Sequence, residues 1–290
     1  MIKIEQDKFN YCGCEIEVED DGSIVLNQNN YIDKIQPIHD IDVKNERKLN
    51  EFEKRKVKAK IGELLWVSLI TRPDISFDVN AVSSQVSDST TKIVKTVNAI
   101  VKKAKLSKSV LKFVRLGDLS KLCVKVYADA SFCNQDGNKR STEGRVVMLA
   151  NKDSDIVNIA SWKTKKIVRV CRSAKAAETR ALEEAIDEAI NTARVVKEIY
   201  TGQVDLKSPD QIPVHAFTDS KSLWESLNNS RQCEEKLLRN SIAAIKELIQ
   251  MKMVLDVSWV PTDRQIADCL TKKGKKAEWL LKTASFNSLN

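Results

Sequence analysis

The stretch Val124-Lys-Val-Tyr-Ala-Asp-Ala-Ser-Phe132 organises the chain. Its apolar residues alternate with other side chains, as in a β-strand that buries one face. The strand carries one carboxylate, Asp129, toward its end, beside the small residues Ala128 and Ala130. We therefore expect Asp129 to bind a metal ion.

Three more acidic residues recur downstream in comparable settings. Glu178 lies near the start of a predicted long helix, Asp219 ends another predicted strand, and Asp268 lies near the start of a predicted late helix. Four carboxylates at one point repel each other, which raises some of their pKa values unless divalent cations neutralise them. Mg²⁺ is a cation that such oxygen ligands suit.

The composition describes a folded chain with a basic balance. The 290 residues are 42% hydrophobic and 30% charged, which allows two modest domains. The formal net charge is +8, and basic residues gather in runs at 54–56, 163–166 and 272–276. These runs favour a polyanionic partner, although solvated helix faces explain part of them.

Cysteine, histidine and hydropathy exclude several classes. None of the seven cysteines is in Cys-x-x-Cys spacing, so we expect reduced thiols. With only His39 and His215 in the chain, a structural zinc site is not expected. No apolar run approaches 18 residues and no signal peptide opens the chain, so the expected location is intracellular, with no membrane partner.

The first predicted domain is small and mainly helical. The expected elements are a β-hairpin within 9–27 and helices at 28–35, 50–71, 74–86 and 90–106. Arg72-Pro73 should end the long helix, and Asp74 should cap the next one. The last helix carries Lys92, Lys95, Lys102 and Lys103, so it could lie against a nucleic-acid backbone or simply form a packing module.

The second predicted domain alternates strands and helices. The expected strands are a short leading one at 110–114 and core strands at 122–127, 145–150, 156–162, 214–219 and 254–260; helices are expected at 174–200, 220–227, 234–251 and from about 263. Gly137 and Gly144 are interpreted as turns between strands, and Ser173 and Gly202 as the ends of the first helix.

In this order of elements the four acids fall on the first core strand, the first helix, the fourth strand and the last helix, which is the ribonuclease H arrangement. The predicted fold class is α/β: a ribonuclease H-like mixed five-stranded sheet flanked by helices, preceded by a smaller mainly helical domain with a β-hairpin. Acids so far apart in the sequence can come together only through the fold.

Six ordered motifs resemble the ribonuclease H of copia-type (pseudoviral) LTR retrotransposons. They are Tyr127-Ala-Asp-Ala130, Arg140-Ser-Thr-Glu-Gly144, the segment 160–166, the segment 172–182, Thr218-Asp-Ser-Lys-Ser222 and the segment 259–272. Upstream, the segments 11–17 and 71–76 resemble the end of the reverse transcriptase region of the same Pol polyproteins. The resemblance covers nearly the whole chain and implies a division into residues 1–107, the reverse transcriptase C-terminal region, and 108–290, the ribonuclease H domain.

The resemblance implies a site and an activity. Asp129, Glu178, Asp219 and Asp268 match the catalytic metal ligands of the family, so two Mg²⁺ ions about 4 Å apart, for which Mn²⁺ can substitute, should support endonucleolytic cleavage of the RNA strand of RNA–DNA hybrids. The implied partners are the hybrid, the upstream reverse transcriptase palm and other Pol products, in a cytoplasmic virus-like particle or the nucleus.

Six further residues could equally contact nucleic acid or have structural or solvated roles: Arg140, Ser141, Thr142, Lys163, Lys165 and Lys166. We expect His215 to be structural, and Asp187 and Glu188 to face solvent. Lys175 stands where many family members have a small polar residue before Glu178, which adds charge close to the expected site.

Other departures from the family limit the expected activity. The reverse transcriptase signature with paired aspartates belongs upstream of the segments present here, so polymerisation by this chain alone is not expected. Neither histidine occupies the loop before the last acid. Two alternatives remain open: a non-catalytic nucleic-acid-binding or structural remnant of a truncated Pol, and a DNA-cutting enzyme of the wider ribonuclease H-like group, such as a transposase.

Overall fold

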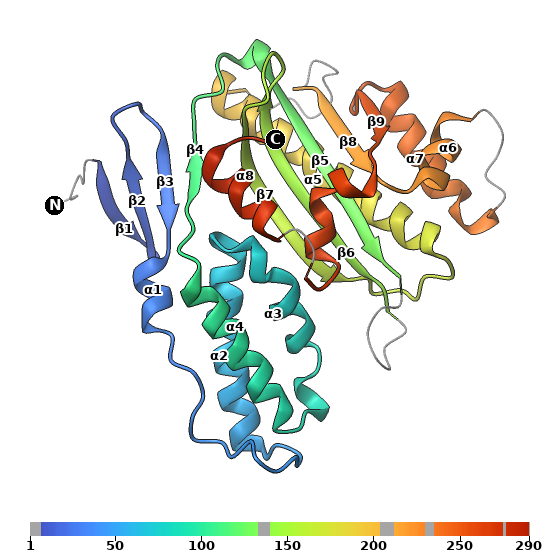
Figure 1. Ribbon diagram of the computed structural model, residues 1–290. Helices are drawn as coiled ribbons and strands as arrows, with labels where there is room; N and C mark the ends of the chain where they lie inside the picture. Colours follow the sequence, from blue (N-terminus) through green and yellow to red (C-terminus); the bar gives the residue numbers. More distant parts are fainter. Residues whose placement is uncertain (1–6, 133–139, 204–211, 230–234, 275–276, 290) are drawn as a thin grey trace. The chain divides into compact units, whose positions relative to one another are not determined.

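The computed structural model describes residues 7–132, 140–203, 212–229, 235–274 and 277–289 (Figure 1). The chain forms two compact units. Unit 1 comprises Met1–Val114 and Ala277–Phe286, and unit 2 comprises Arg115–Lys276 and Asn287–Asn290. The boundary between the units falls between residues 114 and 115, whereas the sequence analysis set it after residue 107. Unit 1 also includes a late helix within 277–286.

Unit 1 contains a four-stranded antiparallel sheet in the order β1-β2-β3-β4, formed by Lys8–Tyr11, Cys14–Val18, Ile24–Asn27 and Leu111–Phe113. The predicted hairpin is confirmed as β2 and β3, with Gly22 in the turn at a φ of +78°. Strand β4 corresponds to the predicted leading strand of the second domain. Its partner is β3, with Leu111 opposite Leu26, so it belongs to the sheet of unit 1.

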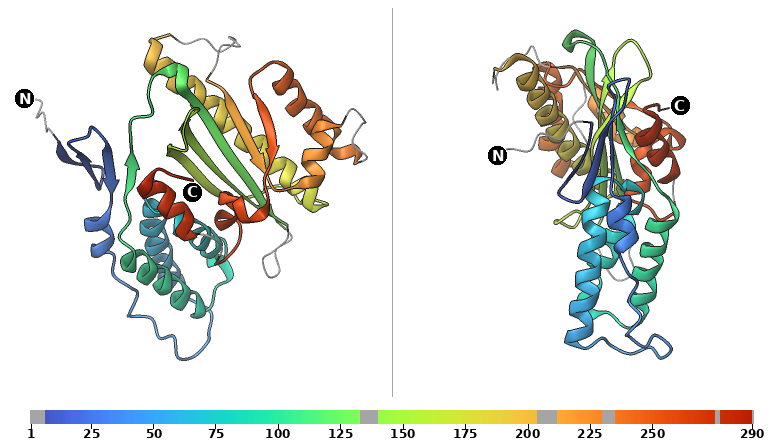
Figure 2. Two further views of the ribbon diagram at one scale, coloured as in Figure 1. Left: turned by 45° about the horizontal axis from the view of Figure 1, so that its top comes forward. Right: turned by 90° about the vertical axis from the view of Figure 1, so that its left-hand side faces the viewer.

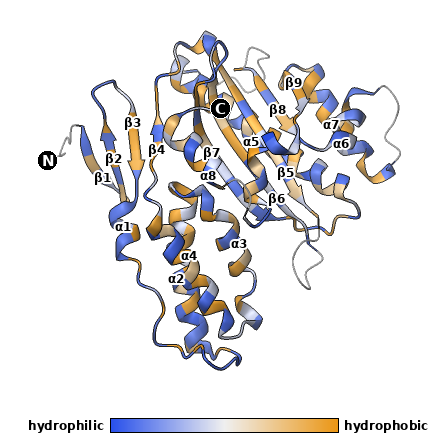
Figure 3. Ribbon diagram, in the orientation of Figure 1, coloured by the Kyte–Doolittle hydropathy of each residue, from blue (hydrophilic) through white to orange (hydrophobic). Residues whose placement is uncertain are grey.

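Four helices of unit 1 contribute to one hydrophobic core: α1 (Asn29–Lys34), α2 (Glu51–Ile70), α3 (Ser76–Ser83) and α4 (Lys92–Leu106). Helix α8 (Ala277–Phe286) also belongs to unit 1 and contacts β4 and the 3₁₀ helix Pro73–Ile75. Helix α2 begins with a capping box, in which Asn50 and Glu53 each accept a hydrogen bond from the other's backbone N–H. Helix α4 alternates hydrophilic and hydrophobic bands (Figure 3), because Ile93, Val97 and Ile100 are buried while intervening lysines are exposed.

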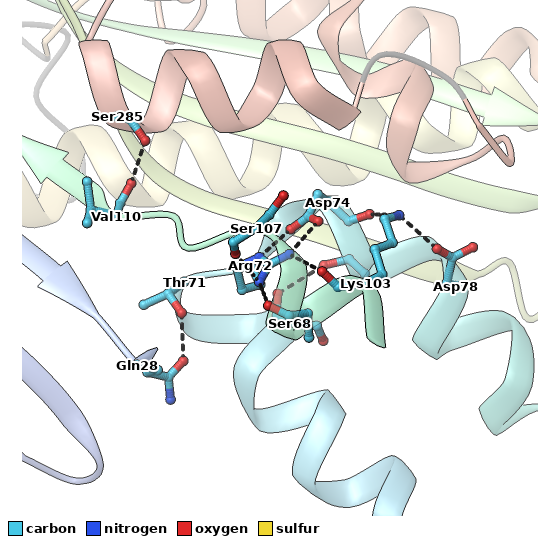
Figure 4. A network of polar contacts seen from close by, with 12 residues as sticks. Gln28, Ser68, Thr71, Arg72, Asp74, Asp78, Lys103, Ser107, Val110 and Ser285 are labelled. Carbon is cyan, nitrogen blue, oxygen red and sulfur yellow. Dashed lines mark hydrogen bonds and ion pairs between the residues drawn. The ribbon is translucent and has the colours of Figure 1, made fainter. Parts of the chain in front are cut away.

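Asp74 does not cap a helix as predicted. It lies in the 3₁₀ helix Pro73–Ile75 and pairs with Arg72, whose Nε and Nη2 donate to its two carboxylate oxygens at 2.8 and 2.9 Å (Figure 4). Arg72 also donates to the backbone oxygens of Ala104 and Ser107, where α4 ends. The guanidinium thereby satisfies carbonyl groups that a helix terminus leaves without partners.

Unit 2 contains a mixed five-stranded sheet in the order β7-β6-β5-β8-β9. Strands β5 (Leu122–Ser131), β6 (Thr142–Asn151) and β7 (Val157–Lys166) are antiparallel neighbours, while β8 (Val214–Thr218) and β9 (Asp256–Trp259) run parallel to β5. The predicted ribonuclease H-like fold class is confirmed by this order of strands, with helices interposed where expected. Gly144, expected in a turn, lies within β6 opposite Asp129.

Helix α5 (Ala174–Thr201) lies along one face of this sheet (Figure 2) and contacts β5, β6 and β8. Both predicted ends are confirmed: the Ser173 side chain accepts a hydrogen bond from the Ala176 N–H, and Gly202 ends the helix at a φ of +67°. Small side chains let the helix approach the strands closely, and they recur at every fourth position: Ala177, Ala181, Ala185, Ala189 and Ala193.

The remaining described helices of unit 2 are α6 (Lys221–Asn228), α7 (Arg239–Gln250) and the 3₁₀ helices η3 (Leu119–Lys121), η4 (Lys236–Leu238), η5 (Thr262–Arg264) and η6 (Ile266–Leu270). The helix predicted from about residue 263 is therefore two 3₁₀ turns. Within the described ranges, no helix combines the length and hydrophobicity that crossing a membrane requires.

Candidate functional site

Asp129 lies near the end of β5 and is fully buried. Its Oδ2 accepts a hydrogen bond from the Thr271 hydroxyl, and the Lys272 Nζ lies 3.4 Å from its Oδ1. Gly144 faces it across the β5–β6 pair, so no side chain from the neighbouring strand covers the carboxylate. The central strand β5 thus places one buried carboxylate near its carboxyl end.

Glu178 lies in the second turn of α5, after the cap at Ser173. Its Oε2 is buried and has no hydrogen-bond partner among the described residues. A buried carboxylate oxygen without a partner is costly, because it has lost its water without gaining a donor or a cation. This oxygen therefore indicates a place where a cation would be stabilised.

Asp219 follows β8 directly, and two residues near β9 hold it. The Thr262 hydroxyl donates to its Oδ2 at 3.0 Å, and the Trp259 Nε1 donates to its backbone oxygen at 3.0 Å. Trp259 is 44% exposed, and its hydrogen bond fixes the backbone at the site. The parallel pairing of β8 with β5 brings Asp219 to the same end of the sheet as Asp129.

Three of the four predicted acids come together. Asp129, Glu178 and Asp219 each offer one oxygen, and these oxygens all lie within 4.8 Å of one another. Three carboxylates at this spacing form a donor set that suits a hard divalent cation such as Mg²⁺. The unpartnered Oε2 of Glu178 fits the same interpretation.

Asp268 lies beside this group and is linked to it through a lysine. It is buried in η6, and its Oδ1 accepts a hydrogen bond from the Lys272 Nζ, which also contacts Asp129. The 3₁₀ helix is anchored to the central strand because the Gln265 Nε2 donates to the Ala128 backbone oxygen at 2.9 Å. The fourth acid, Asp268, therefore lies beside Asp129, and Lys272 contacts both carboxylates.

The electrostatics of the site reflect burial and mutual repulsion. Burial raises the pKa of Asp129 to about 6; Asp219 and Asp268 add to this, while Lys272 and the Thr271 hydroxyl oppose it. Burial and the charges of Asp129 and Asp219 raise the pKa of Glu178 well above its usual value. Burial lowers the pKa of Lys272, but the carboxylates outweigh it and raise that pKa overall.

The six candidate nucleic-acid contacts differ in accessibility. Arg140 and Lys163 are exposed. Ser141 and Thr142 are buried, so their side chains do not lie on the surface where a phosphate contact was considered. The Lys165 Nζ lies 3.7 Å from both Glu143 and Glu184, and Lys166 is half-buried, with its pKa lowered by burial.

Two further expectations concern polar residues outside the acidic group. Asp187 is exposed as expected, but Glu188 is not a free surface acid, because it accepts hydrogen bonds from Arg145 and Ser161. His215 has the structural partner expected of it: its Nδ1 lies 2.7 Å from the Asp256 carboxylate on the neighbouring strand.

The sequence reasoning missed the residues that hold the acids: Gly144, Trp259, Thr262, Gln265, Thr271 and Lys272. All but Gly144 lie within the segment 259–272, which was singled out as a motif for its resemblance. A polar residue every few positions around Asp268 was the available indication, but nothing local says which acid each one contacts.

No model of a known protein family matches the chain. Among solved structures, it is similar to the N-terminal ribonuclease H domain of a Mycobacterium tuberculosis protein, with 18% identity and a TM-score of 0.37 over 52% of this chain and 91% of that one. It is also similar to ribonuclease H1 of Halobacterium salinarum, with 19% identity and a TM-score of 0.36 over 51% and 92% of the two chains. For a foamy viral protease–reverse transcriptase in complex with double-stranded DNA, the identity is 12% and the TM-score 0.49, over 88% of this chain and 38% of that one.

Proposed function

We propose that the chain is a metal-dependent endonuclease that hydrolyses the RNA strand of RNA–DNA hybrids. The observation that carries the proposal is the meeting of Asp129, Glu178 and Asp219, with ligand oxygens within 4.8 Å, at one end of a ribonuclease H-like sheet. The acids come from the first core strand, the first helix and the end of the fourth strand, as the sequence motifs imply.

We propose Mg²⁺ as the resident cation, in two ions, with Mn²⁺ as a substitute. Asp129, Glu178 and Asp219 would hold one ion, and Asp129 with Asp268 would hold the second. When bound, such cations act as Lewis acids that make an attacking water more acidic and stabilise charge on a leaving oxygen. The donor set consists of carboxylate oxygens, the ligands that Mg²⁺ prefers.

The residues around the acids pre-arrange the site. Thr271 orients the Asp129 carboxylate, and Thr262 and Trp259 fix Asp219 from two sides. Burial of Asp129 and Asp268 keeps water away from their oxygens, so interactions with a bound cation would be stronger than at an exposed site. Catalysis is favoured when the side chains of a site need to move little during the reaction.

The basic character of the chain supports a nucleic-acid substrate. The net charge is +8, and Arg140 and Lys163 are exposed in unit 2. In unit 1, the exposed Lys95 and Lys102 of α4 could contact phosphates, which would make this unit a substrate-binding arm.

We assign this activity to a copia-type Pol polyprotein, in which residues 1–107 belong to the end of the reverse transcriptase region. The palm of the reverse transcriptase would be a partner. Cleavage of the hybrid would take place in a virus-like particle of the cytoplasm or in the nucleus.

The test is cleavage of three labelled duplexes by the full purified chain in the presence of Mg²⁺: RNA–DNA, DNA–DNA and RNA–RNA of one sequence. We expect cleavage of the RNA strand of the hybrid alone, with 5′-phosphate and 3′-hydroxyl products, and none with a chelator. Equal cleavage of duplex DNA would favour the transposase-like alternative. Hybrid binding without cleavage in Mg²⁺ or Mn²⁺ would favour the non-catalytic remnant.

A further inference from the structure

The two sides of Asp129 differ in what they contact. On one side, Glu178 and Asp219 lie within 4.8 Å, and the Oε2 of Glu178 has no hydrogen-bond partner among the described residues. On the other side, the Lys272 ammonium lies between Asp129 and Asp268: it donates to the Asp268 Oδ1 and lies 3.4 Å from the Asp129 Oδ1. One side is therefore open to a cation, and a cation belonging to the chain itself occupies the other.

Lys272 reaches this position because of the local backbone. The Lys272 N–H donates to the Asp268 backbone oxygen at 3.0 Å. This turn brings the side chains of Asp268 and Lys272, four residues apart, into contact. Its side chain is 31% exposed, whereas those of Asp129 and Asp268 are almost fully buried. The ammonium thus lies at the mouth of the site, with solvent available on its outer side.

We propose that Lys272 is an internal counter-ion that closes the Asp129–Asp268 side of the acidic group and is displaced when a second divalent cation binds there. The inference rests on the proposed function, because it concerns how the same acids take up their ions. It adds an order to that uptake: the side with Glu178 and Asp219 fills first, and the side with Asp268 fills only when the ammonium moves away.

The physical basis is competition for the same oxygens. An ammonium within hydrogen-bond distance of two buried carboxylates compensates part of the cost of burying their charge. A divalent cation must replace these interactions before it can use the Oδ1 atoms of Asp129 and Asp268. The ammonium therefore weakens binding on this side, and it keeps the buried acids compatible with the fold when divalent cations are scarce.

The experiment is a titration of the full chain with Mn²⁺, in which the electron paramagnetic resonance of free Mn²⁺ reports how many ions bind and how tightly. The variants are Lys272→Met, which removes the charge, Lys272→Gln, which keeps a donor for Asp268, and Lys273→Met as a control at the exposed neighbour. Thermal unfolding is followed without and with Mn²⁺.

In the wild type we expect a stronger and a weaker class of Mn²⁺. Lys272→Met and Lys272→Gln should lower the dissociation constant of the weaker class by about tenfold or more. A neighbouring unit charge usually changes the proton affinity of a carboxylate by at least this factor. The stronger class should change less, and the melting temperature without Mn²⁺ should fall. Lys273→Met should leave all three quantities unchanged.

Two results would overturn the proposal: an unchanged weaker class in both Lys272 variants, or an equal change in Lys273→Met. If Lys272→Met does not fold without Mn²⁺, the result for Lys272→Gln decides. Hybrid cleavage, measured alongside, separates the two inferences. Tightened Mn²⁺ binding in a chain that cuts no hybrid would retain the counter-ion and refute the nuclease, whereas hybrid cleavage with unaltered Mn²⁺ binding would do the reverse.

Discussion

Gly144 faces Leu270 so closely that a methyl group in place of its hydrogen would lie 2.8 Å from the Leu270 Cβ. Such a methyl would also lie 2.8 Å from the Thr271 Cγ2 and 3.2 Å from the Ala267 backbone oxygen. Strand β6 therefore needs a residue without a side chain where η6 packs against the sheet. Because η6 carries Asp268, this glycine determines how close the fourth acid comes to Asp129.

Gly144→Ala should therefore push η6 away from β6. We expect a loss of about 1–3 kcal/mol in the free energy of unfolding, the usual cost of overpacking, together with weaker Mn²⁺ binding. Chemical denaturation and the Mn²⁺ titration measure these effects. Gly62→Ala is the control: it lies on the exposed side of α2 with no atom within 4 Å of an added Cβ, so it should stabilise by about 0.5–1 kcal/mol. Equal stability of the two variants would contradict the close packing of η6.

Asp219→Asn should remove cleavage while leaving hybrid binding largely intact, because it removes one ligand charge and keeps the basic surface. We expect single-turnover cleavage to fall by about a hundredfold or more, since even residues that only orient ligands cost ten- to a hundredfold. Asp187→Asn, at an exposed acid of α5, is the control and should cleave like the wild type. Unchanged turnover in Asp219→Asn would refute a role of this acid in metal binding.

Asp74→Ala should destabilise unit 1 strongly, because it leaves the buried Arg72 guanidinium without its carboxylate (Figure 4). The expected loss is about 3–5 kcal/mol, as for other buried ion pairs that lose one partner. Asp78→Ala is the matched control: it removes a partly exposed pair with Lys103 and should cost about 1 kcal/mol or less. Denaturant titration of both variants provides the comparison, and similar losses would show that burial does not matter here.

Glu53→Gln should reveal a pH-dependent contribution from the Arg47–Glu53 pair. Hydrogen bonds from Arg47 and from the Asn50 backbone lower the pKa of Glu53 to about 2, well below its ordinary value of 4.5. A lowered carboxyl pKa stabilises the fold above the ordinary value, and the contribution is lost as the pH falls through about 2. The melting-temperature difference between wild type and Glu53→Gln should therefore be constant above pH 5 and vanish near pH 2. A difference that does not depend on pH would assign the effect to packing.

Local sequence patterns were sufficient for much of unit 2. The alternation around Asp129 predicted β5, and Ser173 and Gly202 marked both ends of α5, because strand alternation and helix caps depend on residues close in sequence. The order of the acids on these elements then predicted a shared site. The structure places three of them together and the fourth beside Asp129.

Features that depend on distant partners were not predictable in the same way. Asp74 has the sequence context of a helix cap, but its carboxylate binds Arg72, whose guanidinium also donates to the distant backbone oxygens of Ala104 and Ser107. Glu188 has the context of a surface acid, yet Arg145 from β6 binds it. Gly144 has the context of a turn residue, but it lies within a strand. What requires a glycine there is the close approach of Leu270, which lies more than a hundred residues later. For Glu188 and Gly144 the deciding contact is tertiary, and no short window of sequence contains both partners.

Helix α8 gives the chain an interleaved connectivity. The helix belongs to unit 1, where the Ser285 hydroxyl donates to the Val110 backbone oxygen, while Asn287, directly after it, exchanges hydrogen bonds with Val157 of unit 2. A single cut therefore cannot separate the chain into two self-sufficient pieces. A fragment that starts at residue 108 would keep α8 without the 3₁₀ helix Pro73–Ile75 that it contacts, and a fragment that stops before residue 277 would deprive unit 1 of its last helix. Evolution by exchange of whole modules would have to move these two units together.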